Sequence, residues 1–203
     1  MDHPRRPLRR AHRPHARPAW PPAARPHRLL DHRSHIVNVT LTAGGILVGL
    51  APLVWYGARW GKANIKSKTK NWKELIPLVY GFALGILGAM CVGGLLGKLF
   101  GRVRQTSNAI GNKALGATTG ANDAAVAGAH VQPLTIGGSI LVVLAFLALL
   151  SIWKKIDKDD VRMIGAGSFS GCTVGTTAGI GGTGALALVP FVNGLGDSLL
   201  HSI

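Results

Sequence analysis

The chain has few of the residues from which disulfide frameworks and metal sites are built. Its 203 residues include two cysteines and eight acidic side chains, against 23 lysines and arginines. Cys91 and Cys172 each lie in a glycine-rich apolar stretch, so they have neither a metal-ligand spacing nor a disulfide pattern. We interpret both as small packing residues. The six histidines before residue 36 are irregularly spaced, and we expect them to be solvated rather than to bind a metal.

Ionisable groups suited to catalysis are equally scarce. Apart from lysine and arginine, the titratable residues next to the apolar runs are Glu74, Asp123, His130 and Asp197. None is paired at a spacing that suits general acid–base work. The apolar runs themselves carry no ionisable group of the kind that marks pumps and transporters, and no Lys-Ser/Thr pair follows the glycines near 167 to complete a phosphate loop. We expect no enzymatic activity, no cofactor and no metal.

Glycine, by contrast, is abundant, with 28 copies. Small residues recur at every fourth position in two stretches, namely Gly81, Gly85, Ala89, Gly93, Gly97 and Gly101, then Gly167, Gly171, Gly175, Gly179 and Thr183. In water each glycine would weaken a helix by roughly 1 kcal/mol relative to alanine, but in a bilayer small residues let helices touch closely. These two series of small residues, called ladders below, predict a membrane bundle with glycine-zipper packing. In it the glycines from 81 to 97 and from 167 to 179 contact a partner helix.

Two arrangements of the ladders stay open. They can pack against each other within one chain, or at least one can face another copy and build a homo-oligomer, including one around a pore. In the second case four hydroxyl side chains could line water: Ser170, Thr173, Thr176 and Thr177. Hydroxyls in membrane helices more often bond their own backbone or a neighbouring helix.

The N-terminal segment, residues 1–35, differs from the rest. It holds nine arginines, six histidines and seven prolines against two acids. So many prolines exclude a helix, and the composition predicts a disordered tail. Its arginines would attract nucleic acid non-specifically, although we expect a solvated or lipid-bound tail first. A second explanation is that translation begins further downstream, since arginine, proline, alanine and histidine dominate when GC-rich DNA is translated.

Residues 36–203 are expected to form an all-α transmembrane domain, a bundle of about four helices. The predicted spans are 36–57, 75–97, 131–153 and 163–189, each long enough to cross a hydrocarbon core of roughly 30 Å. For the last one we expect a helix that breaks near Pro190 and continues as an interfacial piece, with a re-entrant hairpin as the alternative. The stretch 105–130 predicts a small-residue helix outside the core or lying against the bundle.

Every connecting loop is positive, which makes the orientation hard to assign by the positive-inside rule. The densest patch follows the first span and consists of Arg59, Lys62, Lys66, Lys68, Lys70 and Lys73. We expect these residues to contact anionic head groups or nucleic acid. Without the tail, the loops 58–74 and 154–162 hold ten lysines and arginines against four in 98–130, which favours a cytoplasmic location for the first two.

The basic tail at 1–35 and the glycine-rich spans from Ile36 onward resemble small integral membrane proteins of mobile elements in high-GC actinobacteria, notably the spread proteins of actinomycete conjugative plasmids. The resemblance covers the general plan, without a diagnostic motif. It implies a multi-pass cell-membrane protein, a homo-oligomeric pore or scaffold that works with a DNA-translocating ATPase in plasmid transfer. The alternatives are a phage holin-like pore-forming protein, which would commonly end in a charged tail, and a structural membrane scaffold.

Overall fold

A computed structural model describes residues 41–65, 71–91, 94–120, 125–126, 128 and 131–202. The expected tail at 1–35 lies outside the described residues. Within them, the chain is all-helical apart from two two-residue strands. Its elements are β1 (Leu41–Thr42), α1 (Ala43–Asn64), η1 (Trp72–Leu75), α2 (Ile76–Met90), α3 (Leu95–Thr119), β2 (Ala125–Val126), α4 (Ile136–Ile152), η2 (Trp153–Lys155), α5 (Lys158–Thr173), η3 (Val174–Thr176) and α6 (Ile180–His201).

Three helical segments are long and apolar enough to cross a membrane. They comprise residues 72–90, 136–155 and 181–201. The first two fall within or beside the expected spans 75–97 and 131–153. The expectation of an all-helical chain is confirmed, and these three helices are consistent with a membrane protein.

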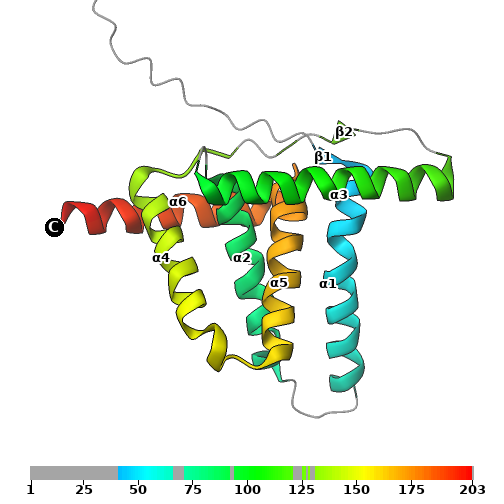
Figure 1. The fold of residues 1–203 in the computed structure, drawn as a ribbon, viewed down its shortest axis with the longest axis horizontal. Helices are drawn as coiled ribbons and strands as arrows, with labels where there is room; N and C mark the ends of the chain where they lie inside the picture. The colour runs from blue at the N-terminus through cyan, green and yellow to red at the C-terminus, as the bar shows by residue number, and fades with distance from the viewer. Residues whose placement is uncertain are drawn as a thin grey trace, which may run out of the picture. The chain divides into compact units, whose positions relative to one another are not determined.

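The helices take two directions. Figure 1 shows α1, α2, α4 and α5 upright beside one another, with α3 and α6 lying across them at one end. α3 packs mainly on α1, and α6 packs mainly on α4. The short strands meet at this same end, where Leu41 pairs with Val126 and Thr42 with Ala125 in antiparallel register.

The chain repeats one order of elements. An upright helix, a second upright helix and a crosswise helix form the first half (α1, α2, α3) and again the second half (α4, α5, α6). Both halves begin with the same local sequence, Leu-Thr-x-Gly-Gly, at 41–45 and 134–138. In each, the threonine is the N-cap of the first helix, and its hydroxyl accepts a hydrogen bond from the second glycine's backbone N–H.

The two halves meet along α2 and α5, which make the most extensive contact between helices. Four glycines bring the backbones together: Gly81 lies on Ile164, Gly85 on Ser168, Gly167 on Leu78 and Gly171 on Phe82. The Ser168 hydroxyl also donates to the Gly81 carbonyl at 3.0 Å. Within one chain, the first glycines of one ladder therefore lie on α5, and the first glycines of the other lie on α2. This is the first of the two arrangements left open above.

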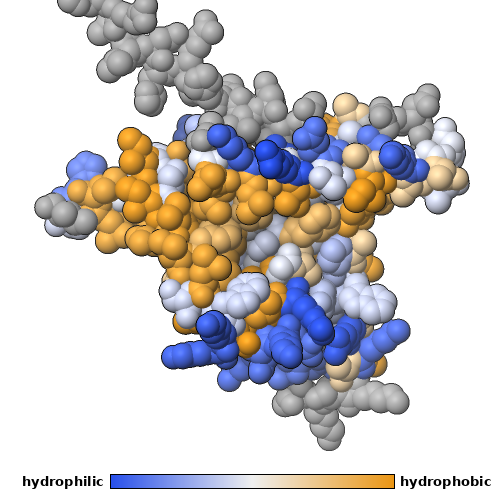
Figure 2. Space-filling view, in the orientation of Figure 1, coloured by the Kyte–Doolittle hydropathy of each residue, from blue (hydrophilic) through white to orange (hydrophobic). Residues whose placement is uncertain are grey.

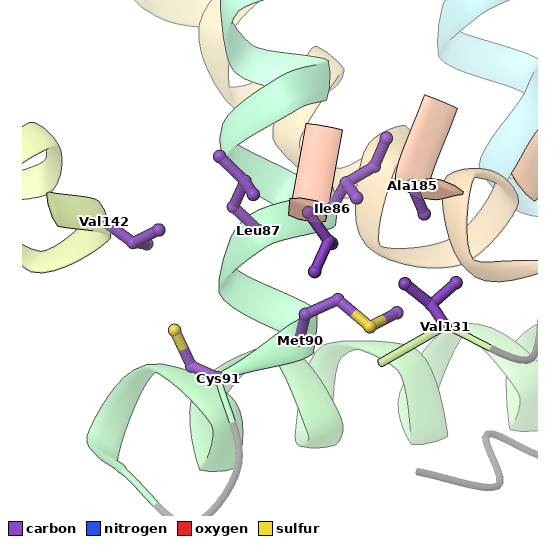
Figure 3. Packing of buried hydrophobic residues seen from close by; sticks show 8 residues of the cluster. Ile86, Leu87, Met90, Cys91, Val131, Val142 and Ala185 are labelled. Carbon is purple, nitrogen blue, oxygen red and sulfur yellow. The ribbon is translucent and has the colours of Figure 1, made fainter. Parts of the chain in front are cut away.

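Apolar side chains fill the space between α2, α4 and α6. Figure 3 shows Leu87 of α2 on the side of Val142 of α4, whereas Ile86 and Met90 extend toward Ala185 of α6 and Val131. Both cysteines are buried and unpaired, in keeping with a packing role. The ring centroids of Phe100 on α3 and Phe146 on α4 lie 5.9 Å apart, which ties the two halves together on a second side.

Two expected spans are interrupted earlier than predicted. The run 75–97 is not one helix, because Cys91 and Gly94 have extended backbone and a new helix starts at Leu95. The C-terminal run does not break at Pro190, which lies inside α6. It breaks before Ile180, where Gly179 has a φ of 89°, a conformation that side-chain-bearing residues rarely adopt.

Candidate functional site

The distinctive site of this chain is the end where α3 and α6 cross the upright helices. In the first half, the Asn108 side-chain carbonyl on α3 accepts hydrogen bonds from the backbone N–H of Thr42 at 3.4 Å and from its hydroxyl at 3.3 Å. Buried Ser107 adds a bond from its hydroxyl to the Gly45 carbonyl at 3.2 Å. One amide on the crosswise helix thus holds the N-terminus of the upright helix.

The second half repeats this arrangement with shorter bonds. The Asn193 side-chain carbonyl on α6 accepts from the Thr135 N–H at 2.9 Å, and the Asn193 amide donates to the Pro133 carbonyl at 3.3 Å. The Thr135 hydroxyl has one proton. It lies 2.9 Å from an Asp197 carboxylate oxygen and 3.4 Å from the Asn193 oxygen, so the carboxylate is the better acceptor.

A pair of glycines completes each crossing. Gly44 of α1 faces Gly111 of α3, and Gly137 of α4 faces Gly196 of α6. At all four positions a Cβ atom would overlap the partner's backbone. The crosswise helices can therefore approach this closely only because neither partner has a side chain at the crossing.

The surface of α3 is basic and apolar at once. The helix has no acidic residue, and its cations are Lys98, Arg102, Arg104 and Lys113. Exposed apolar side chains lie on the same helix, with Leu95 87%, Leu99 56% and Ile110 56% accessible. Figure 2 shows hydrophilic residues along the top of α3 and a hydrophobic band below them. This division is typical of a helix at a membrane surface.

Arg104 differs from the other three cations because it is partly buried. Its Nη1 atom is buried and has no hydrogen-bond partner among the described residues. Burial lowers the pKa of its guanidinium from the ordinary value. An arginine remains charged at neutral pH in any case, so this Nη1 is a cationic donor without an acceptor.

The opposite end carries aromatic rings and mixed charge. Trp60 and Trp72 pack with ring centroids 4.7 Å apart, and the Trp60 indole donates to the Asn71 carbonyl at 2.9 Å. A cavity of about 370 Å³ opens beside them, lined by aromatic, acidic and basic side chains that include Arg59 and Asp160. The expected cationic patch lies here: Arg59, Lys62 and Lys73 are exposed, and Lys66, Lys68 and Lys70 lie outside the described residues.

The remaining predicted packing glycines have different environments. Gly175 lies in η3, where a Cβ would meet the Ile86 side chain. Gly97 belongs to α3 rather than to the helix of Gly81, and Gly93 lies outside the described residues. Gly179 packs against no helix of the same chain, since nothing lies within 4 Å of the position that a Cβ would take. This glycine allows the chain to turn between α5 and α6.

The hydroxyl groups near the end of α5 are not turned toward a channel within the chain. Thr173, Thr176 and Thr177 are buried, and each donates to a carbonyl of its own segment at 2.7–3.0 Å. Gly49 of α1 packs against Thr173. These polar residues therefore line the contact between helices.

Sequence reasoning missed the paired crossings, although a signal was present. The pattern Leu-Thr-x-Gly-Gly occurs twice, and an asparagine followed three residues later by glycine occurs in both crosswise helices, at Asn108 and Asn193. Each pattern is too short to stand out in a glycine-rich chain. Only their contact in three dimensions makes them a unit.

Comparison with known proteins adds no assignment. Within the described residues, no group of three or more His, Cys, Asp or Glu side chains is arranged to hold a metal ion. No protein-family model, curated protein or solved structure matches the chain.

Proposed function

We propose that the chain is a non-enzymatic, multi-pass protein of the cell membrane that acts as a scaffold. In this proposal α1, α2, α4 and α5 cross the bilayer, and α3 and α6 lie in one interface. The observation that carries it is the pair of Thr–Asn–Gly crossings, which hold two amphipathic or apolar helices at the end of upright apolar helices. A protein of this form presents a broad surface at one side of the membrane.

Hydropathy and length identify three helices that could span, whereas the proposal has four spans that are not all among them. Helix packing explains the difference. α5 has 16 residues and many small polar ones, but Ser170, Thr173 and Thr176 are buried among other helices and would not meet lipid. α6 is apolar enough to span, yet Asn193 ties it across the start of α4. The 22 residues of α1 would reach about 33 Å, which is enough to cross.

Charge and aromatic residues support one orientation. The end that carries Trp60, Trp72 and Trp153 also carries the loops 58–74 and 154–162, where most cations outside the tail are found. Tryptophan prefers the interface, and cation-rich short loops stay in the cytoplasm. We place this end in the cytoplasm and the α3–α6 end on the other side.

Cysteine accessibility tests this arrangement. In a chain with Cys91→Ala and Cys172→Ala, single cysteines at Lys62, Lys73 and Lys154 should be protected from a membrane-impermeant maleimide in intact cells. A cysteine at Lys113 should react. Labelling of all four after permeabilisation is the control for reactivity. Reaction of Lys62→Cys in intact cells would reverse the orientation, and labelling of a cysteine at the exposed Ala148 in α4 would contradict the spans.

The proposed biological role is a part of a mobile-element DNA-transfer or spread apparatus, as the resemblance to spread proteins of actinomycete conjugative plasmids implies. Its partners there would be membrane lipids, other copies of the chain and a DNA-translocating ATPase. Since Gly81 and Gly85 of α2 and Gly167 and Gly171 of α5 are used within one chain, an oligomer would have to form through other surfaces. This favours a scaffold over a pore built around the ladders.

Deletion of the gene tests this role. We expect the size of the zone over which plasmid spreads between mycelial compartments to fall severalfold, with no change in cell lysis. Timed overexpression with an endolysin is the contrasting assay. Abrupt lysis in that assay would favour the holin-like alternative, and normal spread after deletion would contradict the transfer role.

A further inference from the structure

The two crosswise helices share a framework but differ in charge. When α3 and α6 are aligned on Asn108 with Asn193 and on Gly111 with Gly196, every cation of α3 has an uncharged counterpart. Lys98, Arg102, Arg104 and Lys113 correspond to Thr183, Ala187, Val189 and Ser198. The second half of the molecule is therefore an internal control for the first.

This comparison separates packing from other roles. α6 crosses α4 with the same threonine, asparagine and glycine contacts that α3 makes with α1, and it does so without a cation. The charges of α3 are thus not required to build the crossing. Lys98, Arg102 and Lys113 are exposed, and the buried Arg104 Nη1 has no acceptor among the described residues. The three exposed cations are open to a partner outside the fold, whereas the buried Arg104 Nη1 is not.

The partner has to match two properties of the same helix. Exposed Leu95, Leu99 and Ile110 present apolar surface, and the cations lie beside it on a helix without acidic residues. A phospholipid offers an acyl chain and a phosphate together, whereas nucleic acid has no aliphatic chain to cover these exposed leucine and isoleucine side chains. Guanidinium groups suit phosphate because they form paired hydrogen bonds with its oxygens.

We propose that α3 binds anionic phospholipids of the leaflet in which it lies. Lys98, Arg102 and Lys113 contact the head-group phosphates, and the exposed leucines pack on the acyl chains. α6 makes no such site and rests in the same leaflet through apolar contacts. This inference depends on the proposed membrane placement of α3 and goes beyond the scaffold role.

The test replaces the three exposed cations of α3 by their α6 counterparts, in Lys98→Thr/Arg102→Ala/Lys113→Ser. The purified protein in mild detergent is titrated with phosphatidylglycerol or phosphatidylcholine, and bound lipid is counted by native mass spectrometry. Each cation near an anionic lipid contributes about fivefold in affinity, so the variant should bind phosphatidylglycerol on the order of 100-fold more weakly. Phosphatidylcholine binding should not change.

A matched control removes the same charge from the other end at three lysines that are also exposed, in Lys154→Ala/Lys155→Ala/Lys158→Ala. It should retain the tight phosphatidylglycerol site. Lys98→Gln/Arg102→Gln alters only exposed side chains and should fold, with an affinity about 25-fold below that of the wild type. Equal losses in the α3 variants and the control would overturn the inference.

Two further outcomes would also overturn it. If the α3 variants lose duplex DNA binding but keep phosphatidylglycerol, the helix serves nucleic acid. If the exposed double variant fails to fold, the cations are structural. The cysteine map described above reports the membrane placement separately, so a correct map with no lipid preference contradicts this inference alone.

Discussion

Gly85→Leu is expected to prevent assembly of the helical bundle. A Cβ at Gly85 would overlap the backbone carbonyl of Ser168, and a leucine cannot be accommodated by moving a flexible neighbour because the obstacle is main chain. Overpacking of a closed contact typically costs about 1–3 kcal/mol for small additions, and separation of α2 from α5 would cost more. Detergent extracts should contain aggregated or degraded chain in place of a single folded species, as measured by size-exclusion chromatography.

The matched control is Gly165→Leu. Gly165 lies on α5 as well, but it is exposed and nothing lies within 4 Å of its added Cβ. The yield and elution volume of this variant should equal those of the wild type. Gly171→Leu, which meets the Phe82 backbone from the opposite side, should behave like Gly85→Leu. A folded monomer with leucine at both Gly85 and Gly171 would rule out the described contact between α2 and α5.

The second prediction concerns the crossing of α6 over α4. Asn193→Ala removes the acceptor of the Thr135 N–H, which is bonded at 2.9 Å, and leaves that donor unpaired in a partly buried site. An unsatisfied buried donor costs roughly 1–3 kcal/mol, so we expect a loss of about 2 kcal/mol in the free energy of unfolding. The measurement is unfolding by dodecyl sulfate, followed by circular dichroism.

The first half of the chain provides the comparison. Asn108 lies less deeply and accepts from Thr42 at 3.4 and 3.3 Å, so Asn108→Ala should cost about 1 kcal/mol. A double-mutant cycle of Thr135→Val with Asp197→Ala should show that the two losses are not additive, because both remove the bond between the Thr135 hydroxyl and the Asp197 carboxylate. Additive losses, or a larger effect at Asn108 than at Asn193, would contradict the assigned bonds.

Local rules were enough to predict that the chain is helical and rich in membrane-compatible segments. The unbroken apolar residues from Ile140 to Leu150 lie within α4. The repeat of small residues also indicated which helix surfaces come close. Gly81 and Gly85 do meet α5, because four-residue spacing brings successive glycines onto one side of a helix.

The ends of the helices were harder to predict. Residues 75–97 are apolar throughout, and nothing in their hydropathy separates Met90 from Leu95. The break at 91–94 exists because the chain has to turn so that α3 can cross α1 through Gly111 and Gly44. Pro190, a strong local signal for a break, is accommodated within α6, while the actual turn is at Gly179.

Composition and periodicity by themselves determined that the helices suit a membrane and which helix faces carry the small residues that allow close contact. Both properties depend on residues close together in the chain. Tertiary structure alone decided which face meets which, and that α6 lies crosswise despite being apolar enough to span. Those outcomes depend on pairs such as Thr135 with Asn193 and Gly137 with Gly196, which are distant in sequence. Their energies arise only when the backbones meet, so no local pattern contains them.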